Sequence, residues 1–77
     1  MLKLLDFLVK AIANFPEEVK IEEKEIGTGN FLYLIQANTA DRPIIIGRQG
    51  KNIRAIREML KIVARREHKR VDVQITE

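Results

Sequence analysis

The chain contains no cysteine, serine or tryptophan and only one histidine, and these absences remove several classes of function. Without cysteine there can be no disulfide, no thiolate metal site and no thiol nucleophile. Without serine, the hydroxyl nucleophile of most catalytic triads is also missing. The single histidine, His68, has no neighbouring cluster of histidines and carboxylates that would hold a metal with it. We therefore expect a binding domain with no catalytic residues, metal or cofactor, rather than an enzyme.

The chain is also short, and it lacks a long uninterrupted apolar run. Its 77 residues allow one domain, which we place at residues 1–77. The apolar stretch near the N-terminus is interrupted by Lys3, Asp6 and Lys10, so we predict neither a secretory signal nor a membrane span. The missing cysteines fit a reducing compartment, and we expect a cytoplasmic protein.

Positive charge is concentrated in the second half of the chain. Residues 1–40 carry four Lys/Arg and six Asp/Glu, a net charge of −2, whereas residues 41–77 carry ten and five, a net charge of +5. All ten of these cations lie within residues 42–70, which contain two acids, so the net charge of that stretch is +8. The asymmetry indicates an anionic partner at one face of the domain, although a solvated helix surface would produce the same pattern.

The spacing of apolar residues predicts three helices and three strands. Helical periodicity predicts helices that end near Asn14, near Ile46 and near Glu67. Alternating or continuous apolar residues predict strands at about residues 18–25, 31–37 and 71–76. Thr39 or Asp41 can cap the second helix.

The same periodicity predicts which residues are buried. On the first helix the buried face is Leu5, Leu8, Val9 and Ile12. On the long third helix it is Ile53, Ile56, Leu60 and Val63, with Met59 and Ala64. Tyr33 lies on an apolar strand, so we expect it in the core and not as an exposed platform for base stacking.

The connections between these elements predict the fold class. The turn cluster at residues 27–30 joins the first two strands as a hairpin. The first strand is polar at residues 23–25, which is typical of a sheet edge. The second and third strands are joined by a helical crossover and can therefore lie parallel and adjacent. We predict an α+β fold of order α-β-β-α-α-β, a three-stranded mixed sheet with helices packed on one face.

One motif carries most of the functional information. Gly47-Arg48-Gln49-Gly50 lies between the second and third predicted helices, and Lys51 follows it. Glycine allows backbone geometry closed to other residues, and a loop that leads into a helix directs free amides toward solvent, where they can bind phosphate. Such a pair of glycines alone indicates only a turn between helices. Here it lies within I-I-G-x-x-G-x-x-I-x-x-I, ahead of a basic helix, which is much more specific.

Ile45 to Ile56 resembles the core motif of a KH domain, a module that clamps about four nucleotides of single-stranded RNA backbone at its GXXG loop. The predicted order of elements and the segments 14–19 and 69–71 are also similar to the small bacterial RNA-binding proteins that consist of one type II KH domain. Pro43 departs from the family, which tends to have a small or flexible residue there. The resemblance implies a single-stranded RNA-binding protein with a post-transcriptional or RNA-chaperone-type role.

The resemblance also implies roles for particular residues. The residues that would contact or support the RNA backbone are Gly47, Arg48, Gln49, Gly50, Lys51 and Arg54. An apolar groove for the bases would be formed by Ile44, Ile46 and Ile53, and bounded on its far side by the strand near Leu34 to Gln36. A helix turns by about 100° per residue, so one of the three consecutive isoleucines must enter the core, and we expect it to be Ile45. Lys61 and Arg65 extend the basic face of the third helix away from the loop, and we expect them to be solvated.

The sequence is also consistent with two other functions. Two helices joined by a glycine turn can also form a helix-turn-helix reader of duplex DNA, although the surrounding strands argue against it. Because one KH module binds few nucleotides, self-association or a second KH-domain protein is a plausible source of avidity. The chain would then be a protein-interaction subunit of a KH-protein complex.

Overall fold

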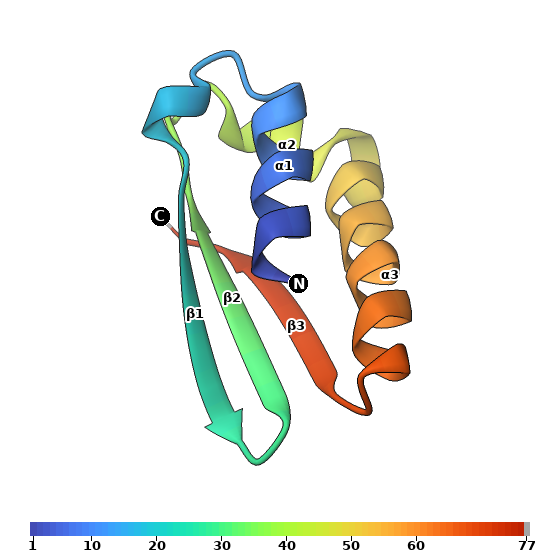
Figure 1. Cartoon of the computed structure of the whole chain (residues 1–77). Coiled ribbons are helices and arrows are strands. Elements are labelled where there is room, and N and C mark those ends of the chain that lie inside the picture. The colour runs from blue at the N-terminus through green and yellow to red at the C-terminus, as the bar shows by residue number, and fades with distance from the viewer. Residues whose placement is uncertain (77) are drawn as a thin grey trace.

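The structure is a computed structural model that describes residues 1–76, and its elements follow the predicted order α-β-β-α-α-β (Figure 1). The helices are α1 (Leu2–Ile12), α2 (Arg42–Ile46) and α3 (Lys51–Arg66). Two short 3-10 turns, η1 (Pro16–Glu18) and η2 (Arg48–Gly50), precede β1 and α3. The strands are β1 (Lys20–Gly27), β2 (Asn30–Gln36) and β3 (Arg70–Ile75).

The three strands form one mixed sheet with the order β1-β2-β3. β1 and β2 pair antiparallel, from Lys20 opposite Gln36 to Gly27 opposite Asn30. β2 and β3 pair parallel, as expected for two strands joined by a helical crossover. The α+β class, the mixed sheet and the position of the polar β1 at its edge are therefore confirmed.

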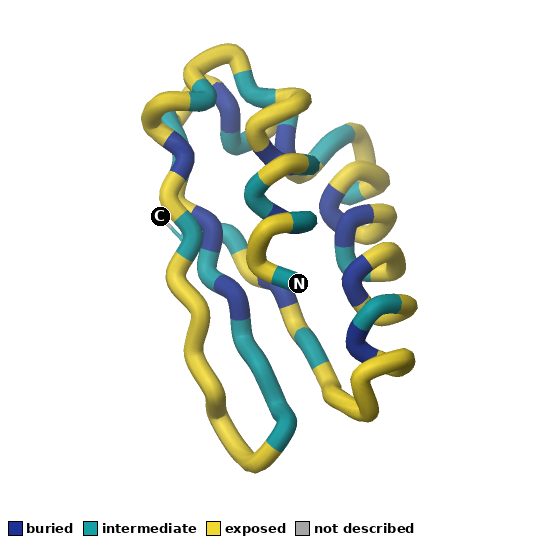
Figure 2. Tube along the Cα trace, viewed as in Figure 1, coloured by how far each residue is buried: buried dark blue, intermediate teal, exposed yellow. Residues whose placement is uncertain are grey.

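All three helices cover the same face of the sheet (Figure 1). The buried residues of the helices and the sheet pack together in one cluster, and Figure 2 marks their positions along the chain in dark blue. Among the largest fully buried side chains are Leu5, Tyr33, Ile35, Ile45 and Leu60. Within residues 1–76, no helix has both the length and the apolar character needed to cross a bilayer.

Two of the residues predicted to be buried are exposed, and two others, Leu8 and Val63, are only half-buried, because helical periodicity shows which residues share a face but not how far a neighbour covers it. Leu5 and Val9 face the sheet and are fully buried, but Ile12, at the end of α1, is 37% exposed. Met59 on α3 is 45% exposed. Both line a shallow groove between α1 and α3, together with Leu8, Asn52, Ala55 and Ile56.

Asp41 holds the first loop to the start of α2. It occupies the N-cap position of α2, but its carboxylate makes no capping bond there. Its two oxygens instead accept hydrogen bonds from the backbone amides of Asn14 (2.8 Å) and Phe15 (2.9 Å), and the residue is fully buried. The expected helix cap is therefore a tertiary link, which fixes α2 against the end of α1.

Tyr33 belongs to the core, as predicted. Only 1% of its surface is exposed, and its hydroxyl donates a hydrogen bond of 2.6 Å to Glu23, the residue directly opposite it on β1. Burial raises the pKa of the Tyr33 hydroxyl well above its ordinary value, and the hydrogen bond and negative charge of Glu23 raise it further. The polar tip of this side chain thus ties the edge strand to the central one.

Candidate nucleic-acid interface

The loop between α2 and α3 is a tight turn framed by two glycines. Gly47 has φ 77° and ψ 168°, and Gly50 has φ 76° and ψ 17°. Between them Gln49 also adopts the left-handed region, with φ 57° and ψ 25°. The amide of Gly50 donates to the carbonyl of Gly47 at 3.0 Å and closes the turn. This backbone leaves the side chains of Arg48 and Gln49 exposed to solvent.

Gly47 is required for two reasons. Its φ and ψ lie in a region that is essentially restricted to glycine. In addition, a Cβ placed on it would lie 2.7 Å from Cγ of Asn52 and 2.8 Å from the Asn52 backbone nitrogen. Asn52 approaches so closely because its side-chain amide donates to the carbonyl of Ile44 at 2.7 Å, across the end of α2. The sequence pattern does not predict this role of Asn52, because the role depends on a contact between α2 and α3.

Cations surround the loop without nearby carboxylate partners. Arg54, one turn into α3, donates from Nη2 to the carbonyl of Gln49 at 2.6 Å and so stabilises the turn. Arg48 and Lys51 are exposed, and no carboxylate within residues 1–76 forms an ion pair with either of them or with Arg54. The positive charge is therefore available to an anion in front of the loop.

The isoleucines before and after the loop divide between core and surface. Ile45 is fully buried, which confirms the expected choice among the three consecutive isoleucines. Ile44 is half-buried and Ile46 is 37% exposed, so both can offer apolar surface beside the loop. Ile53 is only 7% exposed and packs in the core, so it supports this surface from below.

The strand beside α3 is β3 and not the central strand. Both edges of β2 are paired, one with β1 and one with β3, so the expectation that the segment near Leu34 to Gln36 bounds a groove stays a prediction. Arg57 of α3 instead donates from Nε to the carbonyl of Val73 on β3 at 2.9 Å. The backbone amide and carbonyl of Val73 bond to the side chains of Asp72 and Arg57, so the open edge of β3 lies along the basic side of α3.

Part of this open edge is already occupied. The carboxylate of Asp72 accepts a hydrogen bond from the amide of Val73 at 2.8 Å and lies 3.5 Å from Nε of Arg57. Arg57 is thus engaged with the sheet, and Asp72 partly neutralises it. The loop residues carry the free charge at this end of the molecule.

Comparison with known proteins identifies the family. The family model described as "KhpA/KhpB, KH domain" matches residues 3–75. The chain is 38% identical to RNA-binding protein KhpA of Chlamydia pneumoniae, over 100% of this chain and 97% of that protein. It is 33% identical to RNA-binding protein KhpA of Clostridium acetobutylicum, over 97% and 99% of the two chains.

A more distant relative covers both chains completely. RNA-binding protein KhpA of Listeria monocytogenes is 30% identical over 100% of each chain. No solved structure matches the chain significantly. The match of the family model to nearly the whole sequence, and the type II order of the elements around the loop, show that the chain belongs to the KhpA/KhpB family of KH-domain proteins.

Proposed function

We propose that this protein binds single-stranded RNA and clamps its phosphate backbone at the loop of residues 47–50. The observation that supports this most strongly is the loop itself, which exposes Arg48 and Gln49 between two glycines and has unpaired cations beside it. The KhpA relatives carry the name RNA-binding protein, which supports RNA as the ligand. The role is binding, without catalysis, metal or cofactor, in a post-transcriptional or RNA-chaperone-type process in the cytoplasm.

In the proposed complex, consecutive phosphates contact the backbone and side chains of Gly47, Arg48, Gln49 and Gly50. Lys51 supplies a further positive charge, and Arg54 holds the Gln49 carbonyl through its hydrogen bond. About four nucleotides are held at such a loop. Their bases lie on the exposed surfaces of Ile44 and Ile46 and face the open edge of β3. Tyr33 is buried, so we propose aliphatic contacts and hydrogen bonds for the bases, not aromatic stacking on this residue.

The test replaces both exposed loop residues with acids, Arg48→Asp and Gln49→Asp. Asp tolerates the left-handed backbone of position 49 better than most residues, so the circular dichroism spectrum should stay unchanged. We expect the affinity for a single-stranded RNA of about eight nucleotides to fall by about 100-fold or more, because the loop changes from cationic to anionic. Fluorescence anisotropy measures the affinity.

The matched control is Lys3→Asp with Lys24→Gln, which changes the net charge by the same amount at two exposed positions outside the loop. The control should bind RNA within about threefold of the wild type. Equal binding by the loop variant and the wild type would exclude the proposed clamp. Stronger binding to duplex DNA than to the single strand would favour the helix-turn-helix alternative.

We also propose that the protein self-associates through its helical layer, with a second KH-domain protein as the other possible partner. Apolar side chains are exposed on α3 and α1, at Met59 (45%), Ile62 (58%) and Phe7 (68%). Met59 and Ile62 lie three residues apart and share one face of α3. Light scattering should show a dimer that Met59→Gln with Ile62→Gln converts to a monomer. A monomeric wild type at high concentration would exclude self-association.

A further inference from the structure

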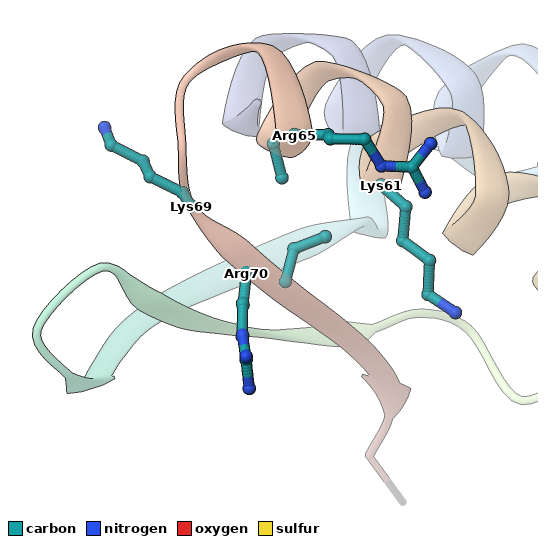
Figure 3. Close-up of a pocket in the computed structure, with 6 residues that line it drawn as sticks. Lys61, Arg65, Lys69 and Arg70 are labelled. Atoms are coloured by element: carbon teal, nitrogen blue, oxygen red, sulfur yellow. The ribbon is translucent and has the colours of Figure 1, made fainter.

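A basic cleft lies at the end of α3 that is far from the GXXG loop. It is lined by Lys61, Ala64, Arg65, Lys69, Arg70 and Val71 and has a volume of about 400 Å³. The four cations come from α3, from the turn after it and from the start of β3, as Figure 3 shows. Ala64 and Val71 form an apolar floor between them. Lys61 and Arg65 extend from α3 on one side of the cleft, whereas the side chains of Lys69 and Arg70 extend in other directions from its rim (Figure 3). Nζ of Lys69 lies 5.2 Å from the centre of the Phe31 ring.

Much of this charge is not neutralised by the protein. Lys61 lies 3.3 Å from Glu58, and Lys69 lies 3.5 Å from Glu67. Neither Arg65 nor Arg70 has an ion-pair partner among residues 1–76. Both are exposed, so their guanidinium groups are accessible to a ligand. Guanidinium groups suit phosphate, because their planar donors match two of its oxygens.

The α3 residues that line the cleft lie on the same helix face as Arg54, which contacts the loop. Arg54, Arg57, Lys61 and Arg65 are spaced three or four residues apart and share one helix face. Arg54 contacts the loop at one end, and Lys61 and Arg65 line the cleft at the other. Between them Arg57 is held against β3 and faces Asp72. The cations of this face therefore form two groups, one at the loop and one at the cleft, with Arg57 held against β3 between them.

We propose that this cleft is a second phosphate-binding site, which takes the backbone of the same RNA strand beyond the nucleotides held at the loop. The inference rests on the proposed RNA-binding function and extends its substrate class to strands longer than the GXXG loop alone can hold. Lys51 and Arg65 lie fourteen positions apart on α3, a rise of about 20 Å. A strand of about four nucleotides has all of its phosphates engaged at the loop, whereas a longer one has further phosphates for the cleft. Lys61 and Arg65, which we expected to be merely solvated, would contact phosphate.

The experiment compares two arginines that follow one another in the last turn of α3. Arg65 lines the cleft, whereas Arg66 is also exposed but does not line it. We measure the affinities of the wild type, of Arg65→Gln with Arg70→Gln, and of Arg66→Gln with Lys3→Gln for single-stranded RNAs of about four and about twelve nucleotides. Both double variants lose two positive charges, so the overall charge effect is matched.

In the wild type, the longer RNA should bind more tightly than the shorter one by about tenfold. The cleft variant should lose about tenfold on the longer RNA and less than twofold on the shorter one. For the longer RNA, the slope of the logarithm of its binding constant against the logarithm of salt concentration should become shallower by about 0.7 for each phosphate contact removed. The control variant should keep the length effect.

The outcomes separate this inference from the function on which it rests. If both double variants bind the longer RNA equally well, the cleft is not a phosphate site, although the loop still binds RNA. If the wild type binds neither RNA, the proposed function itself fails.

Discussion

Each end of α3 adjoins a turn with positive φ, but the two turns use different residues there. At the N-terminal end, the loop of residues 47–50 uses glycine at two of its three positions with positive φ. At the C-terminal end, the turn to β3 also needs a positive φ, but His68 provides it at 59°. The two turns lie at opposite ends of the helix (Figure 1).

The difference between the ends shows what glycine is needed for. The turn at His68 is held by hydrogen bonds from the amides of His68 to Arg65 (3.2 Å) and of Lys69 to Ala64 (2.7 Å), the pattern of a Schellman motif. A side chain fits at His68, at the cost of a strained but accessible backbone. At Gly47 it does not fit, because Asn52 fills the space where a Cβ would lie. The loop therefore requires glycine for close approach as well as for its handedness.

The largest expected effect comes from Gly47→Ala. The substitution combines a backbone conformation that only glycine adopts with contacts of under 3 Å to Asn52. We expect the free energy of unfolding to fall by about 3 kcal/mol or more, measured by urea denaturation.

Gly50→Ala is the matched variant within the same loop. Gly50 also has a positive φ, but the nearest atom to an added Cβ is Cγ2 of Ile53 at 4.0 Å, an ordinary contact. Only the conformational strain remains, and the loss should be about 1 kcal/mol. Equal losses for the two glycines would show that the contact with Asn52 is not what distinguishes them.

The smallest effect is expected at the other end, for His68→Gly. Glycine relieves the left-handed strain, which costs about 1 kcal/mol for ordinary residues, but it also adds conformational freedom to the unfolded chain. We expect a net stabilisation of about 0.5 kcal/mol, visible as a small rise in melting temperature.

A β-branched residue at this position sharpens the test. His68→Val should destabilise the protein by about 1–2 kcal/mol, because a branched side chain tolerates the left-handed region poorly. A gain in stability for the valine variant would contradict the strain at position 68. RNA binding at the GXXG loop should be unaffected by either substitution, since His68 lies at the far end of α3.

Local patterns in the sequence predicted much of the structure. The helices, the hairpin and the fully buried Ile45 follow from the spacing of apolar residues, since periodicity is a property of a single segment. The GXXG loop also followed from its local motif. The errors at Ile12 and Met59 have a common cause: their exposure depends on how far α1 and α3 cover one another, which neither helix encodes by itself.

The sequence by itself determined that this is a small α+β domain with a glycine loop and an excess of positive charge in its second half. Only the tertiary structure decided that Asn52 fills the space beside Gly47, that Asp41 binds the amides of the first loop, and that Arg65 and Arg70 line one cleft. The physical reason is that these contacts join residues from different elements. Their distances are set by the packing of helices on the sheet, and residue spacing along the chain does not record that packing.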